Sequence, residues 1–209
     1  YDSTSISSYS ETLKQIQYGK NKEDDKLAQL NLLLVFGEES GLPFYYRKLA
    51  GNIPDVKTVK NLLADLDVLG LKKVKLVMDR GFYSEANING MYREHLKFLV
   101  GVRTSLSFIR KELDSSMDEI RMFYNYDEGL HTYGVTIPTE WDYTQERAYK
   151  HDTIKEKRRI YVQLYYSIDK GADDELAFDK KLAELRNEII TGQQVESHAK
   201  QYAQFFETK

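Results

Sequence analysis

The first half of the chain alternates short apolar runs with turn-forming segments. Apolar and β-branched residues predict strands at residues 1–8, 30–36, 44–49, 74–78 and 98–102. The strand at 30–36 is apolar almost throughout, which is typical of a strand covered on both faces, and Gly41-Leu42-Pro43 predicts a hairpin to the next strand. These strands are the framework into which two helices fit.

Helical spacing of apolar residues marks both predicted helices of this half. The first begins at Pro54-Asp55, with Asp55 as its N-cap, and ends at Gly70. The second follows Ser84, which has the right side chain for an N-cap. Strand, hairpin, helix, strand, helix and strand is the order expected of an α/β fold, in which helices flank a mixed sheet.

The second half changes character. At residues 123–136 and 159–168 aromatic and β-branched residues alternate with polar ones, which predicts antiparallel strands with one solvated face. Helical periodicity returns at 174–190, with Gly192 beyond its end, and at 197–206. We therefore expect a core at residues 1–108, a β-rich insertion at 109–170 and a helical segment at 171–209.

The amino-acid composition limits the metal ligands and the partners that the chain can have. The chain has 209 residues, of which 41% are hydrophobic, enough for a real core, and its 30 Lys and Arg nearly cancel its 33 Asp and Glu. It has no cysteine, so a metal would be held by oxygen or histidine ligands, which favours Mg²⁺ or Mn²⁺. No apolar run approaches the roughly 18 to 20 residues of a membrane span, so we expect a cytoplasmic protein with no membrane partner.

Two aspartates are the candidate catalytic residues. Asp79 ends the strand at 74–78, where α/β folds commonly present functional groups, and Asp2 lies in the first strand. If these strands are neighbours, the two carboxylates converge and can share divalent cations that act on a phosphodiester. The alternative is an unrelated α/β domain in which Asp79 only caps a turn and Asp2 is a solvated side chain.

Three stretches carry a family resemblance: the opening YDSTSIS, residues 19–55 and the segment VMDRGFYSEANI at 77–88. Together they resemble bacterial insertion-sequence transposases of the DDE class. The resemblance implies a ribonuclease H-like mixed sheet flanked by helices, with a β-rich insertion. In that family an Asp followed shortly by Thr supplies the first metal ligand, matched by Asp2 and Thr4, and the Asp of a DRGFYS-like motif supplies the second, matched by Asp79.

The implied activity is metal-dependent cleavage and strand transfer of transposon-end DNA. The implied cofactor is Mg²⁺ or Mn²⁺, the partners are transposon-end and target DNA, and the full-length protein is expected to form a homodimer at the nucleoid of a bacterium. Two alternatives stay open. One is a structure-selective nuclease on the same fold, and the other is a non-catalytic DNA-binding or interaction protein derived from a transposase.

One family feature is missing. The third ligand of these enzymes is a Glu in the pattern Tyr, two residues, Arg, three residues, Glu, six residues, Lys, and no tyrosine here is followed by Arg at that spacing. The chain also opens at Tyr1 without an initiating methionine. We therefore expect an excised fragment that is inactive alone, with the third acidic residue beyond Lys209.

Several other side chains are weaker candidates. Arg80 can meet a phosphate or pair with a carboxylate, and Tyr83 can line the site or simply pack. Glu85 is a conceivable substitute metal ligand, although its position favours interaction with a helix dipole. Trp141 can stack on a DNA base or anchor the insertion. Further cations can follow a DNA backbone or form solvated faces: Arg103, Arg110, Lys111 and the run at 155–159.

Overall fold

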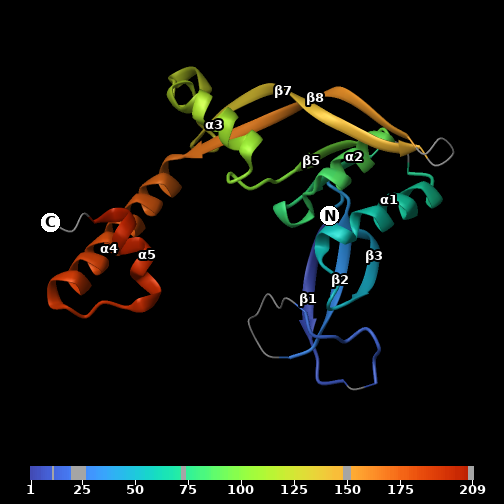
Figure 1. Cartoon of the computed structure of the whole chain (residues 1–209). Helices are drawn as coiled ribbons and strands as arrows, with labels where there is room; N and C mark the ends of the chain where they lie inside the picture. Colours follow the sequence, from blue (N-terminus) through green and yellow to red (C-terminus); the bar gives the residue numbers. More distant parts are fainter. Residues whose placement is uncertain (11, 20–26, 72–73, 148–151, 207–209) are drawn as a thin grey trace. The chain divides into compact units, whose positions relative to one another are not determined.

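The computed structural model describes residues 1–10, 12–19, 27–71, 74–147 and 152–206. The chain forms two compact units, one made of residues 1–109 and 140–159 and the other of residues 110–139 and 160–209 (Figure 1). Both candidate aspartates belong to the first unit. The fold is α/β, with separate groups of antiparallel and parallel strands and helices between them.

The first unit opens with a three-stranded antiparallel sheet in the order β1-β2-β3. It contains β1 (Asp2–Ser7), β2 (Gln29–Phe36) and β3 (Pro43–Ala50). Gly41 has a φ of 61°, which suits glycine in the turn between β2 and β3. The three strands and the hairpin predicted from the sequence are therefore confirmed.

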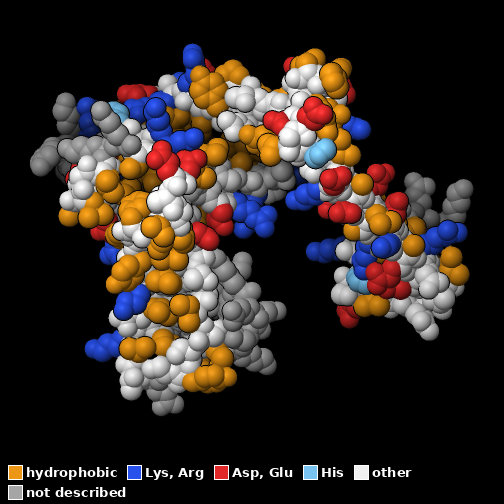
Figure 2. All heavy atoms as spheres, turned by 180° about the vertical axis from the view of Figure 1, so that it is seen from behind, with side chains coloured by type: hydrophobic (Ala, Val, Ile, Leu, Met, Phe, Trp, Pro, Cys, Tyr) orange, Lys and Arg blue, Asp and Glu red, His pale blue; other side chains and the backbone are white. Residues whose placement is uncertain are grey.

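The two faces of this sheet are covered unequally. Leu33 and Val35 of β2 are buried, but Leu34, on the opposite face, is only half-buried. The register places Asp2 and Tyr46 beside Leu34 on that face, and Tyr46 is 65% exposed. The prediction that residues 30–36 form a strand covered on both faces is thus wrong, and hydrophobic side chains gather at the surface over this sheet in Figure 2. Asp2 consequently stands on an open face.

Two helical segments follow β3, one of 3₁₀ type and one α-helix. These are η1 (Asp55–Lys57) and α1 (Val59–Val68). Asp55 is not the N-cap of the helix, contrary to the sequence prediction, because η1 forms a separate tight turn in which the amide of Thr58 donates to the carbonyl of Asp55 at 2.9 Å. Thr58 instead precedes α1. The predicted end is confirmed, since Gly70 adopts a left-handed φ of 70°.

Helix α1 covers the closed face of the sheet. Arg47 of β3 donates from Nη1 to Oδ2 of Asp65 in α1 at 2.6 Å, and the Tyr45 hydroxyl donates to the same oxygen. Apolar residues of α1 complete the packing, and four of them are buried: Val59, Leu62, Leu63 and Leu66.

A parallel pair of strands completes the part of the fold that carries the candidate site. It consists of β4 (Lys75–Met78) and β5 (Lys97–Val100), joined by η2 (Arg80–Phe82) and α2 (Glu85–Arg93). Ser84 caps α2 as predicted, because its Oγ accepts a hydrogen bond from the amide of Asn87 at 3.1 Å. The backbone nitrogen of Tyr1 donates to the carbonyl of Val77 at 3.1 Å. This bond joins the start of β1 to β4.

The segment after β5 differs in part from the sequence prediction. Residues 107–120 form a helix, α3 (Ser107–Ile120), although most of this range was predicted to belong to a β-rich insertion. Its buried residues, Ile109, Ser116 and Ile120, recur at helical spacing, but the charged and serine-rich residues between them obscure that period. The strands β7 (Thr132–Arg147) and β8 (Asp152–Ser167) are longer than predicted. The start of the predicted strand at 123–136 instead forms η3 (Phe123–Asn125) and the short β6 (Tyr126–Asp127), and the sheet order is β6-β7-β8.

The last helices are α4 (Ile168–Thr191) and α5 (Ala199–Phe205), with η4 (Glu196–His198) between them. Gly192 ends α4 with a φ of 72°, as predicted. Nδ1 of His198 lies 3.0 Å from Glu188 Oε2, which also accepts from the Tyr202 hydroxyl, so one carboxylate joins the elements. Across the residues that the structure describes, no helix combines the length and the hydropathy needed to cross a bilayer.

Candidate functional site

Asp79 is held by the turn that follows β4. Its backbone is extended, and its Oδ1 accepts a hydrogen bond from the amide of Gly81 at 2.7 Å, which makes it the N-cap of η2. The residue is nevertheless exposed. The turn therefore orients the carboxylate and leaves it accessible to a ligand.

Asp2 lies close to the same place. Its Oδ1 accepts from the amide of Ser3 at 2.7 Å, and the residue is exposed on the open face of β1. Burial lowers the pKa of the Tyr1 amino group, while the charges of Asp2 and Asp79 oppose that effect. The hydrogen bond from the Tyr1 nitrogen to the Val77 carbonyl brings the chain segments that carry Asp2 and Asp79 together.

A third carboxylate, predicted from the sequence only as a helix cap, faces the same turn. A Cβ added to Gly81 would lie 3.0 Å from Asp79 Oδ1 and 3.5 Å from Asp55 Oδ2. The two carboxylate oxygens are therefore separated by no more than the sum of those distances. Among the described residues, however, no group of three or more acidic, histidine or cysteine side chains is arranged to hold a metal ion.

The turns that carry Asp55 and Asp79 are tied together by Asn87, a residue that was not among the sequence-predicted candidates. Asn87 is buried in α2, and its Nδ2 donates to the carbonyl of Val56 at 2.8 Å and to that of Phe82 at 2.8 Å. One amide group thus sets the spacing of η1 and η2. An Asn three residues after a helix cap gives no sequence signal of such a role.

The weaker candidate residues of the sequence analysis are exposed or half-buried on β1 and around the start of α2. Thr4 is exposed on the same face of β1 as Asp2, two residues further along the strand. Arg80 is exposed within the turn itself, and Glu85 is exposed at the start of α2. Tyr83 is half-buried 6.4 Å from the ring of Phe108, and burial, followed by the charge of Glu85, raises the pKa of its hydroxyl.

Trp141 packs inside the first unit. It is 8% exposed, its indole N–H donates to Asn89 Oδ1 at 2.8 Å, and its ring meets that of Phe108 edge to face at 5.9 Å. This is the arrangement of a buried anchor. The indole is covered by protein in this conformation, so stacking on a base would require it to leave its place.

Two of the four basic residues in the run at 155–159 make contacts within the protein. Lys157 pairs with Asp142 at 2.6 Å. Arg158 pairs with Glu156 at 3.1 Å and lies over the ring of Tyr143, 3.6 Å from its centroid. Arg103, Arg110 and Lys111 are exposed.

The geometry defines an α/β domain with exposed carboxylates gathered where β1 meets the end of β4. The model of the family described as Transposase DDE domain matches residues 1–195. Because this match spans most of the chain, the protein belongs to the DDE transposase family, whose members cleave and transfer DNA. No curated protein matches the sequence.

The role of Asn87 can be tested by substitution. Replacing it with alanine leaves the carbonyls of Val56 and Phe82 without their donor, so we expect Asn87→Ala to lower the free energy of unfolding by about 1–3 kcal/mol. Urea denaturation measures this change. Asn61→Ala, at an exposed position of α1, is the control and should change stability by less than about 0.5 kcal/mol. Equal stabilities of the two variants would contradict the role given to Asn87.

Proposed function

We propose that this chain is the catalytic domain of a DDE transposase that cleaves transposon-end DNA and joins it to target DNA by metal-dependent phosphoryl transfer. Asp2 and Asp79 are the proposed catalytic residues and metal ligands. One observation carries this proposal most directly: the Tyr1 nitrogen donates to the Val77 carbonyl at 3.1 Å, so β1 meets β4 one residue before Asp2 and two residues before Asp79. The family match supplies the reaction class.

The strand arrangement supports a ribonuclease H-like core. The antiparallel sheet β3-β2-β1 ends at β1, and the bond from Tyr1 to Val77 supports our proposal that β4 and its parallel partner β5 come next in one mixed sheet. A mixed sheet with this order brings the first aspartate of one strand beside the residue that ends another. The proposed fold and the proposed site therefore depend on the same strand contact.

The donor chemistry fits a hard divalent cation. Both aspartates are exposed carboxylates, and Mg²⁺ typically binds through one or two carboxylates while keeping several waters. Bound Mg²⁺ or Mn²⁺ would supply Lewis-acid activation of a water or 3′ hydroxyl and stabilisation of the leaving oxygen. We propose that a third acidic residue, beyond Lys209, completes the ligand set.

The chain's own residues would prepare this site. Asp2 and Asp79 would hold the cation, and the amide of Gly81 orients Asp79 through its hydrogen bond. Asp55 adds a further negative charge beside Asp79. Because carboxylates repel both one another and DNA phosphates, this arrangement makes approach of a scissile phosphate depend on a bound cation. We further propose that the full-length protein acts as a homodimer on paired transposon ends, at the bacterial nucleoid.

Manganese binding tests the two-aspartate site. Mn²⁺ titration followed by electron paramagnetic resonance should show a site in the 209-residue chain. Asp2→Asn and Asp79→Asn should each weaken it by about tenfold or more, about 1.4 kcal/mol, because each substitution removes one charged ligand and keeps the side-chain shape. Asp67→Asn, at an exposed position of α1, is the matched control and should bind as the wild type does. Unchanged affinity in both site variants would rule out these ligands.

Gly81 offers a finer test of the turn. In Gly81→Ala the added methyl would lie 3.0 Å from Asp79 Oδ1, so the carboxylate must move, and we expect Mn²⁺ affinity to fall several-fold while the circular dichroism spectrum is retained. In the control Gly129→Ala the methyl meets Asp127 Oδ1 at 3.4 Å, an ordinary contact. If Gly81→Ala binds Mn²⁺ as tightly as this control, the orientation of Asp79 by the turn is irrelevant to binding.

A further inference from the structure

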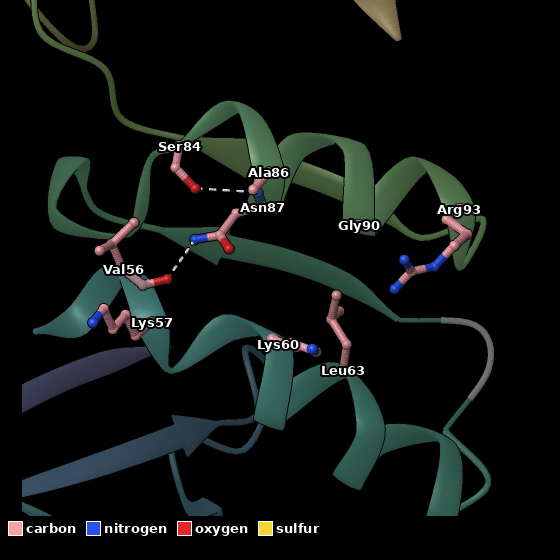
Figure 3. Close-up of a pocket in the computed structure, with 9 residues that line it drawn as sticks. All are labelled: Val56, Lys57, Lys60, Leu63, Ser84, Ala86, Asn87, Gly90 and Arg93. Atoms are coloured by element: carbon pink, nitrogen blue, oxygen red, sulfur yellow. Dashed lines mark hydrogen bonds between the residues drawn. The ribbon is translucent and has the colours of Figure 1, made fainter. Parts of the chain in front are cut away.

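A groove of about 660 Å³ lies between α1 and α2, in the same unit as the carboxylates (Figure 3). One wall comes from η1 and α1 and the other from α2 and its cap. The residues that line it are Val56, Lys57, Lys60, Leu63, Ser84, Ala86, Asn87, Gly90 and Arg93. None of these lining residues is acidic, although acidic residues outnumber basic ones in the whole chain by 33 to 30. The groove is therefore a local concentration of positive charge.

The three cations come from both walls. Lys57 and Lys60 are exposed on the α1 side and Arg93 is exposed on the α2 side, as Figure 3 shows. Arg93 also donates from Nε to Glu94 at 2.9 Å, an exposed contact between sequence neighbours. Its guanidinium has further N–H groups to offer a ligand. Cations on two sides of one groove suit an extended polyanion better than a single small anion.

The α2 wall of the groove is built from small side chains. It includes Ser84, Ala86 and Gly90, and the two helices approach closely at Gly90, since a Cβ there would lie 3.3 Å from Leu63 Cδ1. Val56 and Leu63 give the groove apolar surface for sugar carbons. Helix α2 has 9 residues, about 14 Å at 1.5 Å per residue, which is long enough to face more than one phosphate.

The groove also leads away from the candidate site. Figure 3 shows that α1 and α2 begin at the same end of the groove, so the positive ends of both helix dipoles lie there. Asp55 directly precedes the lining residue Val56, and η2, which begins after Asp79, ends at Phe82, two residues before the α2 cap Ser84. A phosphate chain lying along the groove would therefore pass near the proposed metal site at one end.

We propose that the groove between α1 and α2 binds the sugar–phosphate backbone of the DNA substrate, with Lys57, Lys60 and Arg93 contacting successive phosphates. This proposal rests on the proposed transposase function for the identity of the polyanion. Contacts of this kind position DNA without reading its sequence, so the groove would serve any sequence that the reaction requires.

The salt dependence of DNA binding tests the proposal. The 209-residue chain is titrated onto a fluorescent duplex of about 20 base pairs in EDTA, from about 50 to 200 mM salt. We expect the triple variant Lys57→Gln, Lys60→Gln and Arg93→Gln to bind at least tenfold more weakly at low salt. The slope of log K against log salt should fall by about 0.9 for each phosphate that the variant no longer neutralises. The triple variant Lys48→Gln, Lys75→Gln and Lys97→Gln removes the same charge from exposed positions outside the groove and is the control.

A second variant separates binding from folding. Ala86→Glu places an anion on the groove wall in the first turn of α2, where a carboxylate interacts favourably with the helix dipole, so the fold is retained. We expect it to weaken DNA binding several-fold. Ala64→Glu, at an exposed position of α1 that does not line the groove, should have a smaller effect.

The outcomes are separable from those of the manganese experiment. If the groove variants bind DNA with the affinity and salt slope of their controls, or if the wild-type chain does not bind DNA at low salt, the groove proposal fails. The manganese site does not enter this assay because EDTA is present. Absence of the Mn²⁺ site with intact groove effects would instead overturn the proposed function and leave a DNA-binding groove.

Discussion

The hydrogen bond from the backbone nitrogen of Tyr1 to the carbonyl of Val77 is the contact on which the proposed site depends. It joins strands that are 76 residues apart in the sequence. Asp2 follows one of its partners directly and Asp79 lies two residues beyond the other. The face on which Asp2 stands is set by the pairing of β1 with β2, where a shift of one residue would turn Asp2 toward the covered face because side chains alternate along a strand. Backbone pairing, more than any side-chain contact, therefore determines whether the two carboxylates meet.

The surroundings of this contact are organised by a few small polar interactions. The amide of Gly81 orients Asp79, and Asn87 ties the turn after β4 to the turn before α1. That second link brings Asp55 to the same turn. Carboxylates this close together repel one another and repel DNA phosphates unless cations offset their charge. The groove cations Lys57, Lys60 and Arg93 belong to the same unit as the carboxylates, and in the proposed complex one DNA backbone would contact both the groove and the metal site.

Local structure followed closely from the sequence. Alternating apolar runs located the strands, and Ser84, Gly70 and Gly192 marked helix ends because their side chains or their freedom at positive φ meet specific backbone needs. The prediction that Asp55 caps α1 was wrong for a local reason. The chain makes a 3₁₀ turn before α1, and Thr58 takes the N-cap position. Helix α3 was missed because polar residues dominate its sequence between three widely spaced buried positions.

The site itself was less accessible to sequence reasoning. Position at a strand end singled out Asp79, but Asp2 gained weight only from the hypothesis that its strand lies beside that of Asp79 and from the family resemblance, because the two strands are far apart along the chain. No sequence pattern singled out Asn87 or the groove cations as functional residues. Lys57, Lys60 and Arg93 come from two helices, and only packing places them on one groove. Such long-range arrangements depend on tertiary contacts that no local pattern contains.

Anomalous diffraction from crystals grown with Mn²⁺ would show whether Asp2 and Asp79 share a cation. We expect an anomalous peak within coordination distance of carboxylate oxygens of both residues, about 2.0–2.2 Å for a hard divalent ion of this size. A peak bound elsewhere, or carboxylates of Asp2 and Asp79 that point apart with no metal between them, would contradict the two-aspartate site.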